Sequence, residues 1–183
     1  MSGFPLFKAL PNLITIGRLI LVPAIISMII DRRWETAFIV FVIAGVSDAI
    51  DGFLAKRFGL ATELGAYLDP IADKALLVSI FVALAVVQVI PSPLTILVVS
   101  RDCLIVGAVI LARVLDHRVA VRPLWISKVN TTVQIAFAAT MLAAKAFSLD
   151  FGLWFPVFVI AVAALTLASA AAYLQQWLRL MTA

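Results

Sequence analysis

The chain has 183 residues, of which 64% are hydrophobic and 13% are charged, and its formal net charge is +4. Soluble domains are about half apolar with about a quarter of their residues charged, and one small core cannot hide this much apolar surface. The composition therefore excludes an ordinary soluble domain and indicates an integral membrane protein. An excess of Lys and Arg is ordinary in the cytoplasmic loops of such proteins, so we expect no nucleic-acid partner.

Six apolar stretches follow one another along the chain, each about the 20 residues that a helix needs to cross the hydrocarbon core. They cover residues 12–30, 36–56, 64–88, 93–114, 125–146 and 153–178. Charged residues or prolines separate them, such as Asp31, Arg32 and Arg33 after the first stretch. The sequence thus predicts an all-α, polytopic membrane protein with about six transmembrane helices in a single domain, residues 1–183. Residues 1–11 could add a short interfacial helix.

The basic residues between the stretches are unevenly distributed, which predicts the orientation of the chain in the membrane. An N-terminus in the cytoplasm leaves only Arg32, Arg33 and Lys145 on the outer side. The inner side then collects Lys8, Lys56, Arg57, Arg113, Arg118, Arg122, Lys128 and Arg179. We therefore expect both termini, and the loop after the second stretch, on the cytoplasmic side.

Four aspartates lie in the second and third stretches, where a carboxylate costs about 2.5–3.5 kcal/mol to insert. Asp48 and Asp51 are three residues apart, and Asp69 and Asp73 are four apart, so the members of each pair share one helix face. A short turn around Gly59 would make the two helices antiparallel neighbours. All four carboxylates could then converge at one depth.

Divalent cations are the natural compensation for four converging carboxylates. Oxygen ligands suit Mg²⁺, Mn²⁺ or Ca²⁺, and two carboxylate pairs can hold two ions roughly 3.5–4 Å apart. No His or Cys joins the cluster, which argues against zinc or copper. In the alternative interpretation the acids pair with cations or line a water-filled vestibule, but Lys56, Arg57 and Lys74 are too few to neutralise them.

Small residues accompany the acids. Gly52 follows Asp51, Ala55 comes one turn later, and Gly65 precedes Asp69 by one turn. A helix wall without side chains lets a ligand approach the backbone, which would suit a phosphate compound held by metals. Close helix–helix packing through small residues is the alternative interpretation.

This stretch resembles the signature of the CDP-alcohol phosphatidyltransferases, which transfer a phosphatidyl group from a CDP-linked lipid to an alcohol and release CMP. It reads Asp48-x2-Asp51-Gly52-x2-Ala55-Lys56-x8-Gly65-x3-Asp69-x3-Asp73. The departure is Lys56, where the family has arginine. Lysine keeps the charge but loses bidentate contact with a phosphate, and Arg57 stands next to it.

The resemblance implies a role for each matching residue. Asp48, Asp51, Asp69 and Asp73 would bind two Mg²⁺ or Mn²⁺ ions, with Asp48 and Asp69 shared by both. Asp73 would also be the catalytic base that removes the proton of the acceptor hydroxyl. The CDP-diacylglycerol site would include Asn12, Thr15, Gly52, Ala55, Lys56, Thr62 and Gly65.

The second half of the chain resembles one branch of the family. The segments "IPSPLTILVVSRDCLIVGAVILAR" and "PLWISKVNTTVQI" are similar to CDP-diacylglycerol-dependent cardiolipin synthases of the mitochondrial type, whose acceptor is phosphatidylglycerol. The phosphatidylglycerophosphate synthases, which use glycerol 3-phosphate, are the alternative. Arg101 and Lys128 are candidates for holding the acceptor's phosphate. Arg101 and Asp102 could instead be a mutually satisfied structural pair.

The resemblance also implies partners and a location. We expect membrane lipids and a second copy of the chain, as a homodimer, in the bacterial inner membrane or the mitochondrial inner membrane. The active site would lie near the cytoplasmic face. Two other classes of protein compete with the enzyme. Intramembrane acids can mark the path of a cation transporter, but there is no second acidic layer. A non-catalytic scaffold would have no reason to keep four costly aspartates.

Overall fold

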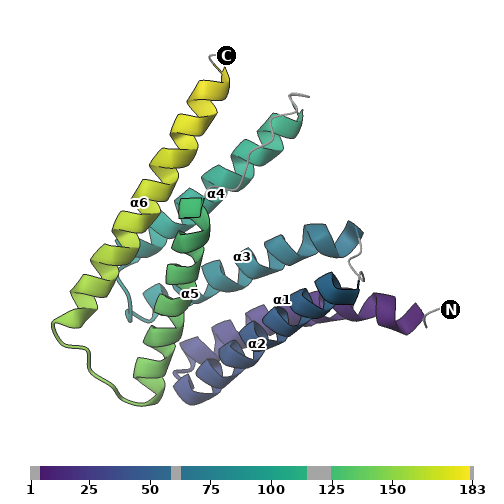
Figure 1. Ribbon diagram of the computed structural model, residues 1–183. Helices are drawn as coiled ribbons and strands as arrows, with labels where there is room; N and C mark the ends of the chain where they lie inside the picture. The colour runs from purple at the N-terminus through teal and green to yellow at the C-terminus, as the bar shows by residue number, and fades with distance from the viewer. Residues whose placement is uncertain (1–4, 59–62, 115–124, 182–183) are drawn as a thin grey trace.

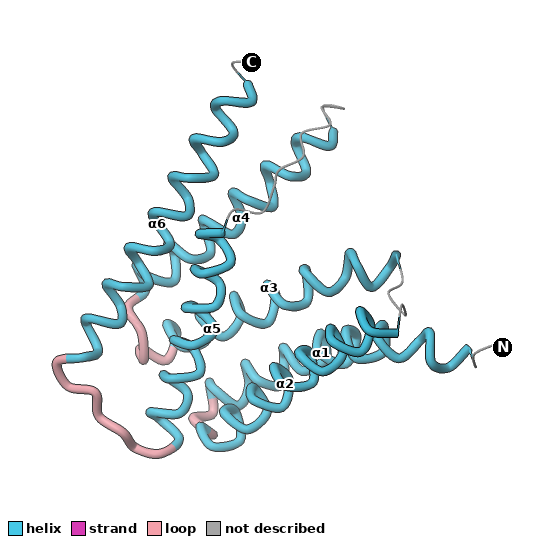
Figure 2. Tube along the Cα trace, viewed as in Figure 1, coloured by secondary structure: helices cyan, strands magenta, loops and turns pink. Residues whose placement is uncertain are grey.

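The computed structural model describes most of the chain. The backbone is described for residues 5–58, 63–114 and 125–181, and the side chains for residues 16–17, 19–48, 50, 72–107 and 125–178. These residues form six helices and no strand, as Figures 1 and 2 show. The helices are α1 (Pro5–Ile30), α2 (Trp34–Phe58), α3 (Glu63–Val86), α4 (Ser92–Val114), α5 (Trp125–Ala146) and α6 (Trp154–Met181).

Each predicted stretch corresponds to one helix, which confirms the all-α prediction. The largest difference is at the N-terminus, where α1 begins at Pro5 instead of residue 12. The separate short helix expected within residues 1–11 is wrong for residues 5–11, which continue α1; residues 1–4 lie outside the described part. A proline at the first helical position needs no N–H partner, so the helix can begin at Pro5.

Helix α1 lies between α2 and α3 and packs against both (Figure 1). In the described parts of α2 and α3 the two helices do not contact each other, so the expectation of direct neighbours is wrong there. The physical reason lies in α1, whose Ile25 and Ile29 are fully buried. They share one apolar core with Phe41 of α2 and Ile80 of α3. An apolar helix gains most when it is covered on both sides.

The helices of the second half are joined to one another through α6. Helix α6 packs against α4 and α5, and this group meets the first through contacts of α5 with α2 and of α3 with α4 and α5. Phe81 of α3 and Phe137 of α5 lie across this junction, with ring centroids 5.9 Å apart. Polar side chains within α3 and α4 and at the start of α5 are thereby brought within reach of one another.

Three turns connect the odd-numbered helices to the next helix, and all three use the same backbone geometry. Arg32, Gln88 and Ser148 have positive φ angles of 57°, 62° and 53° and lie just beyond α1, α3 and α5. After α1, the amide of Arg33 donates to Met28 O at 2.8 Å and that of Arg32 to Ile29 O at 3.1 Å. These are the two bonds of a Schellman motif, which usually has glycine at the positive-φ position.

One helix passes a combined test of length and hydropathy for crossing a membrane. It is the segment Trp154–Leu178 of α6, with a mean hydropathy of 2.3, and the test covers only the residues that the structure describes. Large apolar side chains are also exposed, among them Leu104, Ile160 and Leu174. The expectation of about six membrane-spanning helices stays a prediction for the other helices.

Candidate functional site

The four predicted metal ligands lie on two helices. Asp48 and Asp51 are on α2, and Asp69 and Asp73 are on α3. The side chain of Asp48 is half-buried and that of Asp73 is exposed, whereas the side chains of Asp51 and Asp69 lie outside the described residues. Within the described side chains no group of three or more His, Cys, Asp or Glu is close enough to hold a metal. The convergence of all four carboxylates therefore stays a prediction.

The predicted ligands can still be tested for chemical fit. All four are carboxylates, on helices that both pack against α1. Carboxylate oxygens are the ligands that Mg²⁺ and Mn²⁺ prefer. The donor set therefore fits a hard divalent cation.

The predicted CDP-diacylglycerol site falls on the first three helices. Asn12 and Thr15 are on α1, Gly52, Ala55 and Lys56 are on α2, and Gly65 is on α3. Thr62 lies outside the described residues, as do the side chains of the other six. Because α1 packs against α2 and α3, the backbones that carry these residues belong to one helical group.

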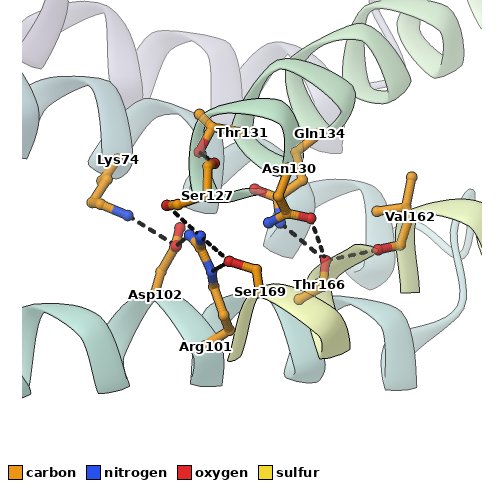
Figure 3. Close-up of polar contacts among 10 residues, drawn as sticks. All are labelled: Lys74, Arg101, Asp102, Ser127, Asn130, Thr131, Gln134, Val162, Thr166 and Ser169. Atoms are coloured by element: carbon orange, nitrogen blue, oxygen red, sulfur yellow. Dashed lines mark hydrogen bonds and ion pairs between the residues drawn. The ribbon is translucent and has the colours of Figure 1, made fainter. Parts of the chain in front are cut away.

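A polar network is buried between the helices of the second half (Figure 3). At its centre is Arg101 of α4, whose side chain is almost fully buried. Its Nη1 donates to Asp102 Oδ1, and its Nη2 donates to Ser127 Oγ of α5 at 2.6 Å. Nε and Nη2 both donate to Ser169 Oγ of α6, at 3.2 and 2.6 Å. The guanidinium carbon also lies 5.9 Å from the centre of the Tyr173 ring.

Lys74 extends this network to α3. Its Nζ is 2.8 Å from Asp102 Oδ1, the same oxygen that accepts from Arg101. The Asp102 side chain is 6% exposed and that of Lys74 is 35% exposed. One carboxylate thus binds two cations, and the network joins α3, α4, α5 and α6.

A second polar cluster lies between α5 and α6. Thr166 Oγ1 lies 3.1 Å from Asn130 Oδ1 and 2.7 Å from Val162 O, two acceptors for its one hydrogen, and Gln134 Nε2 donates to Thr166 Oγ1 at 3.2 Å. Asn130, Gln134 and Thr166 are fully buried. Among the described atoms, Asn130 Nδ2 and Gln134 Oε1 have no hydrogen-bond partner. This cluster packs α5 against α6 beside the Arg101 network (Figure 3).

Arg101 and Lys128, the two predicted acceptor-phosphate residues, have different surroundings. Arg101 is buried and hydrogen-bonded as the structural-pair interpretation requires. Lys128 is exposed, and its Nζ lies 5.6 Å from the centre of the Trp125 ring. A joint role of these residues in binding the acceptor stays a prediction.

Sequence reasoning identified Asp102 as a possible partner of Arg101 but not the polar residues on α5 and α6 that surround this pair. Ser127, Asn130 and Gln134 are three and four residues apart on α5, and Thr166 and Ser169 are three apart on α6. Such spacing puts polar residues on one helix face. That pattern was the available signal, because a polar stripe on an apolar helix predicts a partner on another helix.

An apolar groove of about 830 Å³ lies beside the network, between α4 and α6. Arg101 and Tyr173 are among its lining residues, but most of the lining is apolar, for example Leu104, Leu167 and Leu174.

Comparisons with known proteins agree with the aspartate signature. Residues 8–173 match the family model described as CDP-alcohol phosphatidyltransferase. The chain is 37% identical over 166 residues to the chloroplastic CDP-diacylglycerol–glycerol-3-phosphate 3-phosphatidyltransferase 1 of Oryza sativa subsp. japonica, covering 81% of this chain and 50% of that protein. It is 34% identical over 180 residues to the cardiolipin synthase (CMP-forming) of Homo sapiens, covering 90% and 60%.

A bacterial relative is matched over most of its length. It is the CDP-diacylglycerol–glycerol-3-phosphate 3-phosphatidyltransferase of Escherichia coli (strain K12), 34% identical over 144 residues, which cover 73% of this chain and 76% of that protein. By contrast, the chain spans only about half of the rice protein and about three fifths of the human one.

Proposed function

The chain belongs to the CDP-alcohol phosphatidyltransferase family, and we propose on this basis that it transfers a phosphatidyl group from CDP-diacylglycerol to an alcohol and releases CMP. The observation that carries the proposal is the match over residues 8–173, which includes all four aspartates of the signature. The placement of Asp48 on α2 and Asp73 on α3, both packed on α1, supports it.

Each signature residue has a role in this reaction. Asp48, Asp51, Asp69 and Asp73 would hold two Mg²⁺ or Mn²⁺ ions. When bound, these would neutralise charge on the diphosphate and on the departing CMP. Asp73 takes the proton of the acceptor hydroxyl, whose oxygen forms the new bond to the phosphatidyl phosphorus while the bond from that phosphorus to CMP breaks. The exposure of the Asp73 side chain supports this role, because an acceptor can reach it.

The substrate site would be completed by residues around the aspartates. Gly52 and Ala55 leave room for the cytidine, and Lys56 contacts the nucleotide phosphates. Asn12 and Thr15, together with Thr62 and Gly65, border the same pocket.

We propose phosphatidylglycerol as the acceptor, which makes the product cardiolipin. The human relative, matched over 90% of this chain, is a cardiolipin synthase. The apolar groove between α4 and α6 supports a lipid acceptor, because acyl chains need an apolar surface. Glycerol 3-phosphate is the second candidate, since the rice and E. coli relatives are named for it.

The proposed enzyme works in the bacterial inner membrane or the mitochondrial inner membrane, as a homodimer, with its active site near the cytoplasmic face. The apolar length of Trp154–Leu178 supports the membrane location. The excess of basic residues on one side of the predicted topology supports the orientation.

The test uses the full-length protein in lipid nanodiscs with CDP-diacylglycerol and Mg²⁺ or Mn²⁺. Phosphatidylglycerol and glycerol 3-phosphate are offered separately, and mass spectrometry identifies the lipid formed. We expect CMP and cardiolipin with phosphatidylglycerol alone. Phosphatidylglycerophosphate as the product would favour the second candidate. Cation flux in proteoliposomes without CMP release would favour a transporter.

The catalytic assignment is tested with Asp69→Asn and Asp73→Asn. Asp73→Asn should lower CMP release by about 10²- to 10⁴-fold, the range for loss of a general base, and Asp69→Asn should abolish it because a ligand of the metal ions is lost. Neither change should alter the unfolding temperature by much. Asp31→Asn is the matched control, because Asp31 is exposed in the turn after α1. Full turnover in both signature variants would overturn the assigned chemistry.

A further inference from the structure

The Arg101 network contains more positive charge than it needs for its own hydrogen bonding. Lys74 and Arg101 are cations and Asp102 is the one carboxylate that both contact, so the three side chains together carry a net charge of +1. Asp102 and Arg101 are almost fully buried and would form a neutral pair by themselves. The second cation on Asp102 therefore leaves one positive charge uncompensated among these three side chains.

Arg101 uses its side chain for hydrogen bonds within the protein. Its Nε, Nη1 and Nη2 all donate to side chains of α4, α5 and α6. A guanidinium used in this way on three helices is held in one position. It contributes positive charge to the surroundings, and four of its five N–H donors bind Asp102, Ser127 and Ser169.

Lys74 is different because it is partly accessible. An ammonium has three N–H donors, and among the described residues its contact is Asp102, at 2.8 Å. Its side chain is 35% exposed, against 1% for Arg101. Lys74 also follows Asp73 directly on α3, although side chains of consecutive residues leave a helix in different directions. Asp102 thus holds a partly exposed cation one residue along α3 from the predicted catalytic base.

We propose that Lys74 binds a phosphate oxygen of a substrate, and that Asp102 is the positioning residue that fixes the Lys74 ammonium for this contact. A lysine binds phosphate as a point charge, and one anionic oxygen would balance the net charge of the three side chains. The proposal rests on the proposed function, in which both the CDP-lipid and the acceptor carry phosphate. The phosphate could belong to either substrate, and the experiment separates the two.

The test measures CMP release by the full-length protein in nanodiscs, with each substrate varied in turn while the other is saturating. Lys74→Met should raise the KM of one substrate by roughly 10- to 100-fold, since a hydrogen bond to a charged group is worth one to two powers of ten. Lys74→Arg should restore part of the loss. A raised KM for CDP-diacylglycerol identifies the nucleotide lipid as the source of the phosphate, and a raised KM for the acceptor identifies the alcohol.

A raised KM in Lys74→Met would not be caused by loss of folded protein, because this change leaves Arg101 and Asp102 paired. The unfolding temperature should therefore stay close to that of the unaltered protein. Thr166→Val is the matched control: it removes a buried polar link between α5 and α6 that does not involve Lys74. It should lower the unfolding temperature and leave both KM values unchanged.

The role of Asp102 is tested by non-additivity. Asp102→Asn should raise the same KM as Lys74→Met, and the double variant should raise it no further, because both changes remove one contact. Additive effects on KM would overturn the positioning role. If the unaltered protein releases CMP but Lys74→Met leaves both KM values within twofold, the Lys74 proposal is wrong and the proposed function stands. Absence of CMP release by the unaltered protein would overturn both.

Discussion

This apolar chain contains charged side chains in two different settings. One is the set of aspartates on α2 and α3, and the other is the Arg101 network that joins α3 to α6. Asp48 is half-buried and Asp73 is exposed, so neither carboxylate is sealed inside the protein. Arg101 and Asp102 are buried and bind each other, with serines of α5 and α6 completing the contacts. We propose that the accessible charges serve ligands, whereas the enclosed charges hold helices together. Lys74 combines the two settings, because its side chain is partly exposed while its ammonium binds the enclosed Asp102.

The comparison predicts that removing an enclosed charge affects stability most. Asp102→Ala should lower the free energy of unfolding by about 3–5 kcal/mol, because it leaves Arg101 buried without its carboxylate. Thermal or denaturant unfolding of the full-length protein in a mild detergent measures this. Asp31→Ala, in an exposed turn, should stay within about 0.5 kcal/mol. Equal stabilities of these two variants would remove the distinction between enclosed and accessible charges.

A smaller effect is expected when a neutral partner is lost. Ser169→Ala removes the oxygen that accepts from Arg101 Nε and Nη2, and an unsatisfied buried donor costs about 1–3 kcal/mol. Ser100→Ala on α4 is the matched control because Ser100 is exposed. The same unfolding experiment should rank Ser169→Ala between Asp102→Ala and the control. A loss as large as that of Asp102→Ala would mean that the serine matters as much as the ion pair.

The smallest effect is expected at Lys128. Its ammonium lies 5.6 Å from the centre of the Trp125 ring at an exposed site, where such a contact is worth about 0.5–1 kcal/mol. Lys128→Met should therefore change stability by no more than this, and Lys145→Met on the same helix is an exposed control. The KM of the acceptor tests the predicted role of Lys128 in binding the acceptor's phosphate. A rise in Lys128→Met that is absent in Lys145→Met would make Lys128 a ligand-binding charge.

Most of the fold could be predicted from the sequence, because each apolar run is interrupted by charges or prolines and becomes one helix. The packing order could not. Direct contact of α2 with α3 was expected from their short connection, yet α1 takes the place between them, with Ile25 and Ile29 fully buried. Which helix fills that place depends on the shapes of side chains from three helices, and one sequence does not reveal it.

The candidate site could likewise be predicted from the sequence only in part. The aspartates were identified because their spacing of three and four residues is local and specific. The serine partners of Arg101 were not identified, since Ser127 and Ser169 are 26 and 68 residues away along the chain. Local spacing says nothing about contacts over such separations. The joint geometry of the four aspartates stays a prediction, because the side chains of Asp51 and Asp69 lie outside the described residues.

The turns at Arg32, Gln88 and Ser148 have a practical consequence. They lie at the same end of the molecule (Figure 1) and are held by main-chain atoms, so their side chains are dispensable for the path of the chain. Once the single and exposed native cysteine, Cys103, is replaced, these three positions are suited to attaching thiol-reactive dyes. A dye that cannot permeate a sealed vesicle would then reach all three turns from one compartment or none of them, which reads out the sidedness of the whole bundle.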